Sequence, residues 1–195
     1  MSDSVKMVIK LFIITAVAAL ALGVTHAVTQ EPIRQQNEQA AIESRKAVLP
    51  DGEQFNTVDI SQYQNEYPGI VEVYEGRAGD TGVGYVFKIV SKGYGGDMEL
   101  YVGISASEAK LTGITVVNHS ETPGLGAKAA DPEYLEQFIG KPVENPLNAV
   151  NGEPTKDEEV EAITGATITS KAIIEGINDA ITLYNQVLKD GGEGR

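Results

Sequence analysis

The sequence predicts an α+β protein in which an N-terminal transmembrane helix and a helical stalk precede a mainly antiparallel sheet packed with helices. Residues 11–30 carry no charged side chain, and about 20 such residues suffice to span a bilayer. Four segments rich in β-branched and aromatic residues then follow too closely for helical crossovers. The last segment, to about Lys189, repeats apolar residues at three- and four-residue intervals, as an amphipathic helix does.

The N-terminal segment is expected to anchor the chain in the cell (inner) membrane as a single pass. Lys6 and Lys10 precede the apolar run, so the positive-inside rule places residues 1–10 in the cytoplasm and the remainder outside. A cleaved signal peptide is the alternative, with Thr25-His26-Ala27 as the cleavage pattern. The run exceeds the ~7–15 residues of a signal h-region, which favours a retained anchor.

Beyond the anchor, residues 31–50 predict a helical stalk. The stalk has Pro32 near its start and ends at the turn sequence Pro50-Asp51-Gly52. An extracytoplasmic domain is expected over residues 51–189 and a disordered tail over 190–195.

The domain begins with four expected strands joined by hairpins. They cover residues 70–74, 84–90, 98–102 and 111–117, and a glycine-rich turn, residues 92–96, joins the second to the third. Asp131-Pro132 predicts the start of a short helix. Residues 141–154 are expected to form an irregular loop, and Val160, Ala162 and Ile163 a short strand before the last helix.

Composition excludes several kinds of function. With 15 Lys and Arg against 28 Asp and Glu, the net charge is -13, so nucleic acid is not an expected partner. The chain has no cysteine and only two histidines. Disulfides, thiolate metal sites and cysteine nucleophiles are therefore excluded, and no metal site is expected.

Residues 161–170, Glu-Ala-Ile-Thr-Gly-Ala-Thr-Ile-Thr-Ser, combine small residues and hydroxyls at the expected start of the last helix. Unpaired amides and the positive end of the helix dipole stabilise an anion such as a phosphate there. The alternative interpretation is a helix entry capped by threonine or serine.

A second motif, residues 118–128, follows the fourth expected strand. Its Pro123-Gly124 pair suits the central positions of a type II turn. Around that turn, backbone amides and the Thr122 hydroxyl can converge on a flat ligand that forms hydrogen bonds.

The first motif resembles the flavin-attachment motif of the FMN-binding domain in the G subunit of Rnf complexes and the C subunit of sodium-translocating NADH:quinone reductases, and the second resembles a flavin-site segment of the same Rnf subunit. The first carries Thr164-Gly165-Ala166-Thr167, and the second the run from His119 to Gly126. The resemblance implies that Thr167 bears FMN through a phosphoester bond. Six residues earlier the family usually has Asp, whereas this chain has Glu161.

The resemblance also implies a wider flavin site, with Lys171 as a possible counterion of the phosphate. Three of its members have alternative roles: Tyr94 as a loop residue, Glu121 as a surface carboxylate beside the turn, a partner of a ring nitrogen or an orienter of the turn, and Lys128 as a solvated lysine or a cation beside the reduced ring. His119 is either a solvent-facing strand end or an electrostatic neighbour of the flavin. The expected cofactor-binding residues are Thr164, Gly165, Ala166, Thr167, Thr169, Ser170, Glu121, Thr122, Gly124, Leu125, Gly126, Tyr94 and Lys128.

By this resemblance the chain is a redox-carrier subunit of an Rnf-type translocase, and it is not an enzyme by itself. It would relay electrons between ferredoxin and NAD in a complex that moves ions, and a flavin transferase using FAD would attach the cofactor. The equivalent subunit of the quinone reductase is the alternative, as is a cofactor-free exported assembly or binding module.

Overall fold

The computed structural model describes residues 3–189, which form two compact units divided between Ile42 and Glu43. Helix α1, Asp3–Val48, begins in the first unit and ends in the second. The tail expected over residues 190–195 lies outside the described residues.

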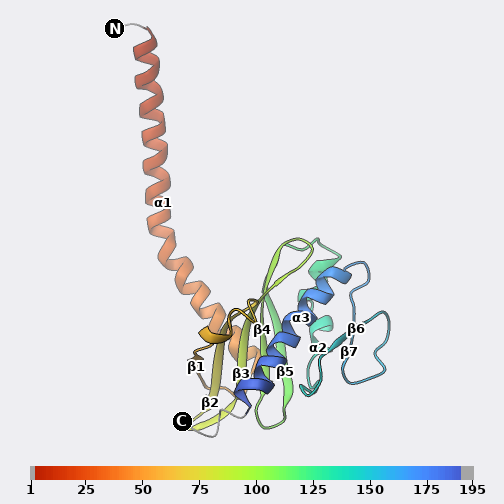
Figure 1. The fold of residues 1–195 in the computed structure, drawn as a ribbon. Coiled ribbons are helices and arrows are strands. Elements are labelled where there is room, and N and C mark those ends of the chain that lie inside the picture. The colour runs from red at the N-terminus through yellow and green to blue at the C-terminus, as the bar shows by residue number, and fades with distance from the viewer. Residues whose placement is uncertain (1–2, 190–195) are drawn as a thin grey trace. The chain divides into compact units, whose positions relative to one another are not determined.

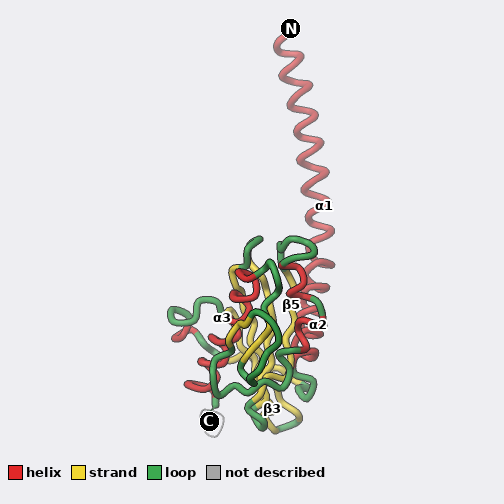
Figure 2. Tube along the Cα trace, turned by 90° about the vertical axis from the view of Figure 1, so that its right-hand side faces the viewer, coloured by secondary structure: helices red, strands yellow, loops and turns green. Residues whose placement is uncertain are grey.

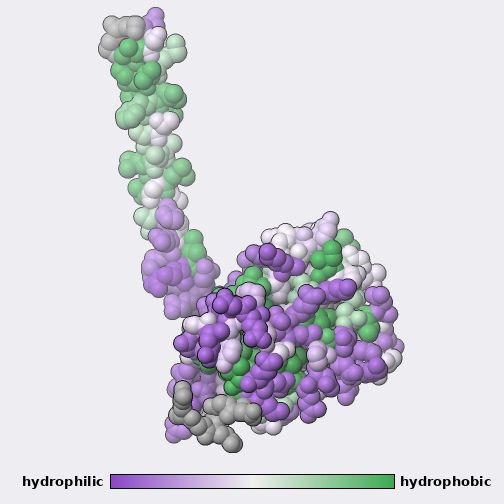
Figure 3. Space-filling view, in the orientation of Figure 1, coloured by the Kyte–Doolittle hydropathy of each residue, from purple (hydrophilic) through white to green (hydrophobic). Residues whose placement is uncertain are grey.

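The first unit, which ends at Ile42, is the exposed part of α1, apolar over residues 11–30 and mostly polar beyond them. By length and composition α1 is able to cross a membrane, a description that a signal sequence would also fit. Anchor and stalk were expected as separate elements but form one helix, with Pro32 inside it. Figure 3 shows apolar side chains around the N-terminal part of this helix and hydrophilic ones further along it. The larger exposed apolar residues include Val8, Leu11, Phe12, Ile14, Leu20 and Leu22.

The second unit is built on an antiparallel sheet whose strands follow in chain order (Figure 1). The five strands are β1 (Gln54–Val58), β2 (Ile70–Ala78), β3 (Thr81–Lys92), β4 (Asp97–Ser105) and β5 (Lys110–Asn118). The last four confirm the expected strands and hairpins. Strand β1 was not predicted, because its sequence Gln-Phe-Asn-Thr-Val is half polar and belongs to an edge strand.

Helix α3, Thr167–Leu183, packs along one face of the sheet (Figures 1 and 2). It continues as one π-helical turn, η3, Tyr184–Leu188, so the helical segment reaches the expected end. Gly176 lets α3 approach the sheet closely, since a Cβ there would crowd Ile89 and Ser91. The fully buried residues between the two layers include Phe87, Ile89, Leu100, Ile104, Ile173 and Ile177.

Glycines on the opposite face of the sheet make room for the chain where α1 ends. Gly103 lies between Val102 and Ile104 of the main core, so its Cα faces the other side. A Cβ at Gly103 would clash with the carbonyl oxygen of Val48. The carbonyl of Val48 also accepts a hydrogen bond from the Thr112 hydroxyl. Val48 and Leu49 are nearly fully buried, which fastens the end of α1 to the sheet.

The remaining elements are short and lie between the strands and before α3. They are η1 (Ser61–Tyr63), η2 (Gly126–Ala130), α2 (Pro132–Glu136), β6 (Asn148–Val150) and β7 (Glu159–Glu161). Helix α2 confirms the expected short helix, although the Asp131 side chain makes no capping hydrogen bond. Strand β6 lies in the stretch expected to be irregular and pairs in parallel with β7. Asn178 of α3 fixes that stretch by bonding the backbone N and O of Leu147 at 2.7 and 2.9 Å.

Candidate functional site

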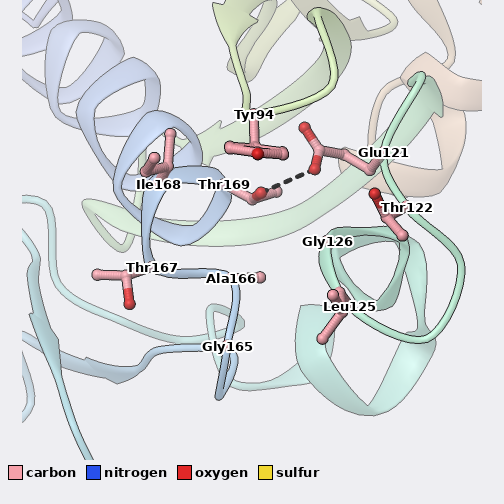
Figure 4. A pocket seen from close by; sticks show the side chains of 10 residues that line it. All are labelled: Tyr94, Glu121, Thr122, Leu125, Gly126, Gly165, Ala166, Thr167, Ile168 and Thr169. Carbon is pink, nitrogen blue, oxygen red and sulfur yellow. Dashed lines mark hydrogen bonds between the residues drawn. The ribbon is translucent and has the colours of Figure 1, made fainter.

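A pocket of ≈ 490 Å³ lies where the two sequence motifs meet (Figure 4). It is formed by the β3–β4 turn, the loop after β5 and the start of α3. Its size is within the range of small-molecule sites. The lining residues are Tyr94, Glu121, Thr122, Leu125, Gly126, Gly165, Ala166, Thr167, Ile168 and Thr169.

The start of α3 supplies one wall of the pocket. Thr167 is the first residue of the helix, and its side chain is exposed. The N-cap residue is Ala166, and no side chain caps the helix. The interpretation of this motif as a threonine or serine cap is therefore wrong. As in any α-helix, the amides of the first turn lack intrahelical acceptors and carry the positive end of the helix dipole.

A tight turn forms the opposite wall. The amide of Leu125 donates to the carbonyl of Thr122 at 3.1 Å, and Gly124 has φ +77°. A positive φ at the third residue is what a type II turn requires, so the expected turn is confirmed. The amide of Ala127 also donates to the Thr122 carbonyl, at 3.2 Å, which leads the chain into η2.

Glu121 lies at the inner end of the pocket with only 7% of its surface exposed. One carboxylate oxygen, Oε1, accepts from the Gly95 amide at 2.9 Å. The other, Oε2, accepts from the Thr169 hydroxyl at 2.9 Å (Figure 4). The backbone amide of Glu121 donates to Nδ1 of His119 at 3.3 Å, so His119 stabilises the loop from outside the pocket lining.

The three hydroxyls after Gly165 have different environments. Thr167 is exposed, whereas Thr169 and Ser170 are fully buried. Ser170 donates to the Ala166 carbonyl at 3.1 Å and accepts from the Ile163 amide at 2.9 Å. Ser170 therefore holds the backbone of the motif in place behind the pocket.

Of the expected site residues, nine line the pocket and four do not. Ser170 is buried behind it, and Gly124 is exposed at the tip of the turn. Thr164 and Lys128 line a neighbouring depression together with Tyr134 and Glu161. Burial there raises the pKa of Tyr134 to about 12, which keeps this phenol neutral beside the motif.

An apolar rim surrounds the pocket, and one of its members was not predicted. Tyr94, Leu125 and Ile168 are 74, 45 and 56% exposed. Ile168 was not predicted as a site residue. Its spacing from Ile173, Ile177 and Ile181 puts it off the buried face of α3 that these three residues form. A large apolar residue outside the buried face is the signal that could have revealed it. No cluster of metal-binding side chains occurs in the described residues, 3–189.

Relatives are similar over nearly the whole chain. The chain is 40% identical to the G subunit of the Na(+)-translocating ferredoxin:NAD(+) oxidoreductase complex of Acetobacterium woodii, over 94% of this chain and 93% of that protein. It is 35% identical to the G subunit of the ion-translocating oxidoreductase complex of Methanosarcina acetivorans, over 93% and 96%. The chain belongs to the family of G subunits of ion-translocating Rnf complexes. This confirms the resemblance expected from the two motifs.

Two further comparisons concern the domain of this G subunit. Residues 93–182 match the FMN-binding domain family, and this segment contains the whole pocket lining. The fold resembles the crystal structure of the C subunit of Na(+)-translocating NADH-quinone reductase from Parabacteroides distasonis, with a TM-score of 0.53, 22% identity, and 66% and 67% of the two chains covered. That likeness confirms the fold class.

Proposed function

We propose that this G subunit bears FMN joined to Thr167 through a phosphoester and relays electrons in a membrane-bound ferredoxin:NAD oxidoreductase complex that translocates ions. The observation that carries the proposal is the placement of Thr167. Its exposed hydroxyl stands at the uncapped start of a 17-residue helix and on the edge of a pocket. Membership in the G-subunit family and the match to an FMN-binding domain support the complex and the cofactor.

The pocket residues fit the parts of FMN. The first-turn amides of α3 and the helix dipole would stabilise the phosphate. Tyr94, Leu125 and Ile168 offer exposed apolar surface to a flat aromatic ring, and the hydroxyl of Thr122, an exposed residue of the lining, offers a hydrogen bond to its polar edge. When bound, FMN supplies the ability to accept and pass on electrons, which the side chains here lack.

Attachment requires a separate transferase and an activated form of the flavin. With FAD as donor, a bond forms between Oγ1 of Thr167 and the FMN phosphorus, and the bond between the two phosphates of FAD breaks. AMP leaves, and the hydroxyl proton goes to a base of the transferase or to water. The exposure of Thr167 supports this, since a transferase must reach the oxygen.

The apolar part of α1 is proposed to anchor the chain in the cell membrane as a single pass. Lys6 and Lys10 support a cytoplasmic N-terminus and a pocket on the other side of the membrane, by the positive-inside rule. Covalent attachment suits that side of the membrane, because FMN that dissociated there would be lost. The other members of the complex are the proposed redox partners. The protein acts as a carrier and not as an enzyme by itself.

The proposal is tested by coexpressing the full chain with a flavin transferase and recording flavin fluorescence in a denaturing gel. The wild type is expected to give a fluorescent band, and Thr167→Ala none. Thr57→Ala is the control, because Thr57 is an exposed threonine of β1, outside both motifs, and should leave the band unchanged. A fluorescent Thr167→Ala band, or a dark wild-type band, would contradict the proposal.

A further inference from the structure

We propose that Glu121 is a positioning residue that presets the pocket by tying the β3–β4 turn to the first turn of α3. The inference rests on the proposed function, since it assigns the tie to the flavin site. Burial of Glu121 contradicts the expectation of a surface carboxylate, and of the remaining roles the inference assigns it that of an orienter. The carboxylate orients the protein around the ligand and does not serve as a hydrogen-bond partner of the flavin.

The first support is the way the structure accommodates the carboxylate. Gly93 and Gly126 stand on two sides of it, and a Cβ at either position would clash with a carboxylate oxygen. Gly126 does not have a positive φ, so its backbone conformation does not require glycine. The space that the carboxylate needs explains why glycine stands there. Two segments, the β3–β4 turn and the loop after the Thr122 turn, are thus shaped around one buried side chain.

The second support is that both carboxylate oxygens are engaged by the protein. Oε1 accepts from the Gly95 amide, 26 residues away in sequence, and Oε2 from the Thr169 hydroxyl, 48 residues away, each at 2.9 Å. Hydrogen bonds to a charged acceptor are about twice as strong as neutral ones. The carboxylate thereby links three segments that are far apart along the chain.

The tie controls the two features on which flavin binding would depend. Gly95 adjoins Tyr94, which is the most exposed residue of the rim. Thr169 lies two residues after Thr167, so holding Thr169 fixes the rotation of the helix and the direction of the Thr167 hydroxyl. By holding Gly95 and Thr169 together, the Glu121 side chain fixes the distance between the rim and the attachment point before any ligand binds.

Four variants of the full chain separate this role from others. Glu121→Met keeps the length and loses both hydrogen bonds. Glu121→Gln keeps them, because its amide oxygen accepts from Gly95 and its NH₂ donates to the Thr169 hydroxyl. Thr169→Val loses one bond at constant size. Thr182→Val is the matched control, because Thr182 donates to the Asn178 carbonyl at 2.7 Å in the same helix, away from the pocket lining.

Amide hydrogen exchange is measured first, on unmodified protein. Exchange at Gly95 is expected to rise about tenfold or more in Glu121→Met, which corresponds to a lost charged hydrogen bond of ~1.5 kcal/mol. Thr182→Val is expected to match the wild type, and Glu121→Gln, whose neutral amide oxygen is a weaker acceptor, to lie between the wild type and Glu121→Met. Faster exchange over residues 167–170 is expected in Thr169→Val, which also serves as the test if Glu121→Met fails to fold.

Visible circular dichroism of the attached flavin is measured second. Glu121→Met and Thr169→Val are expected to lose intensity, and Glu121→Gln to retain it. Equal exchange and equal spectra in Thr169→Val and Thr182→Val would overturn the inference, as would a Glu121→Gln protein that behaves like Glu121→Met. If the wild type carries no flavin, the proposed function fails, whereas the exchange data still decide whether the tie exists.

Discussion

Thr167 and Thr169 stand two residues apart in the first turn of α3, yet their hydroxyls face opposite environments. Thr169 is fully buried and donates to Oε2 of Glu121 at 2.9 Å. Thr167 is exposed on the edge of the pocket. One threonine is thereby committed to the structure, and the other is accessible to modification.

Substitutions at Thr167 should therefore separate chemistry from folding. Thr167→Ser retains an exposed hydroxyl at the helix start and is expected to accept flavin. Thr167→Val is expected to accept none, while its unfolding free energy changes by less than about 0.5 kcal/mol, as is usual for exposed sites. Flavin absorbance per protein and urea denaturation of both variants are the measurements. A flavin-free Thr167→Val that is also unfolded would contradict the division of roles.

The charge of Glu121 should lower the reduction potential of the attached FMN. A buried negative charge lining the pocket disfavours the addition of electrons nearby. Glu121→Gln removes the charge and keeps the shape, so the midpoint potential is expected to rise, by ~59 mV for each tenfold change in a one-electron equilibrium. Redox titration followed by absorbance measures it, with Thr182→Val as the control. An unchanged or lower potential in Glu121→Gln would show that this charge does not act on the flavin.

The junction between α1 and the sheet should depend on Gly103. A methyl group there would clash with the carbonyl oxygen of Val48, and backbone cannot yield as a flexible side chain does. Gly103→Ala is expected to destabilise the second unit by about 1–3 kcal/mol. Chemical denaturation followed by circular dichroism measures the loss. Gly23→Ala, where an added Cβ meets nothing within 4 Å, is the matched control and should leave the midpoint unchanged.

Asp179 should make stability depend on acid pH. Burial, and next the charge of Glu175, raises the pKa of Asp179 above its ordinary 3.8. The folded protein then holds this proton more tightly than the unfolded chain does. Stability from this group is therefore greatest below pH 3.8 and falls as the pH rises through the folded-state pKa.

Asp179→Asn is expected to remove that decline, so the variant should exceed the wild type in stability above this pH window and not below it. Glu175→Gln should have the smaller effect, because burial is the main cause of the shift. Urea denaturation on both sides of the window is the measurement. Parallel pH curves for Asp179→Asn and the wild type would refute the assignment.

The absence of cysteine allows a clean test of membrane topology. Gln62→Cys, at an exposed position of the second unit, should react with a membrane-impermeant maleimide in intact cells. Ser4→Cys, in the N-terminal segment, should react only after the cells are opened. The reverse labelling pattern would contradict the proposed orientation.

The elements that could be predicted from the sequence are those with a local signal. The β-branched runs predicted β2 to β5, and the motif at Thr164-Gly165-Ala166 predicted that α3 begins at Thr167. Strand β6 carries no such signal, since three residues are too few for a pattern and its position is set by Asn178, 30 residues later. Strand β1 was hidden by its polar residues.

The candidate site divides in the same way. Its turn and most of its lining follow from two short motifs. The contacts of Glu121 with Gly95 and Thr169 join residues that are 26 and 48 positions apart, and such pairings arise only when the sheet and α3 pack together. The unusual exposure of Ile168 likewise depends on the rotation at which α3 lies on the sheet.

Peptide mapping by tandem mass spectrometry of the wild-type chain, purified after coexpression with a flavin transferase, tests the central claim most directly. The account predicts that FMN less one water is added to the peptide spanning residues 157–171, and that fragment ions place it on Thr167. The same mass on Thr164, Thr169 or Ser170, or an unmodified peptide, would contradict it.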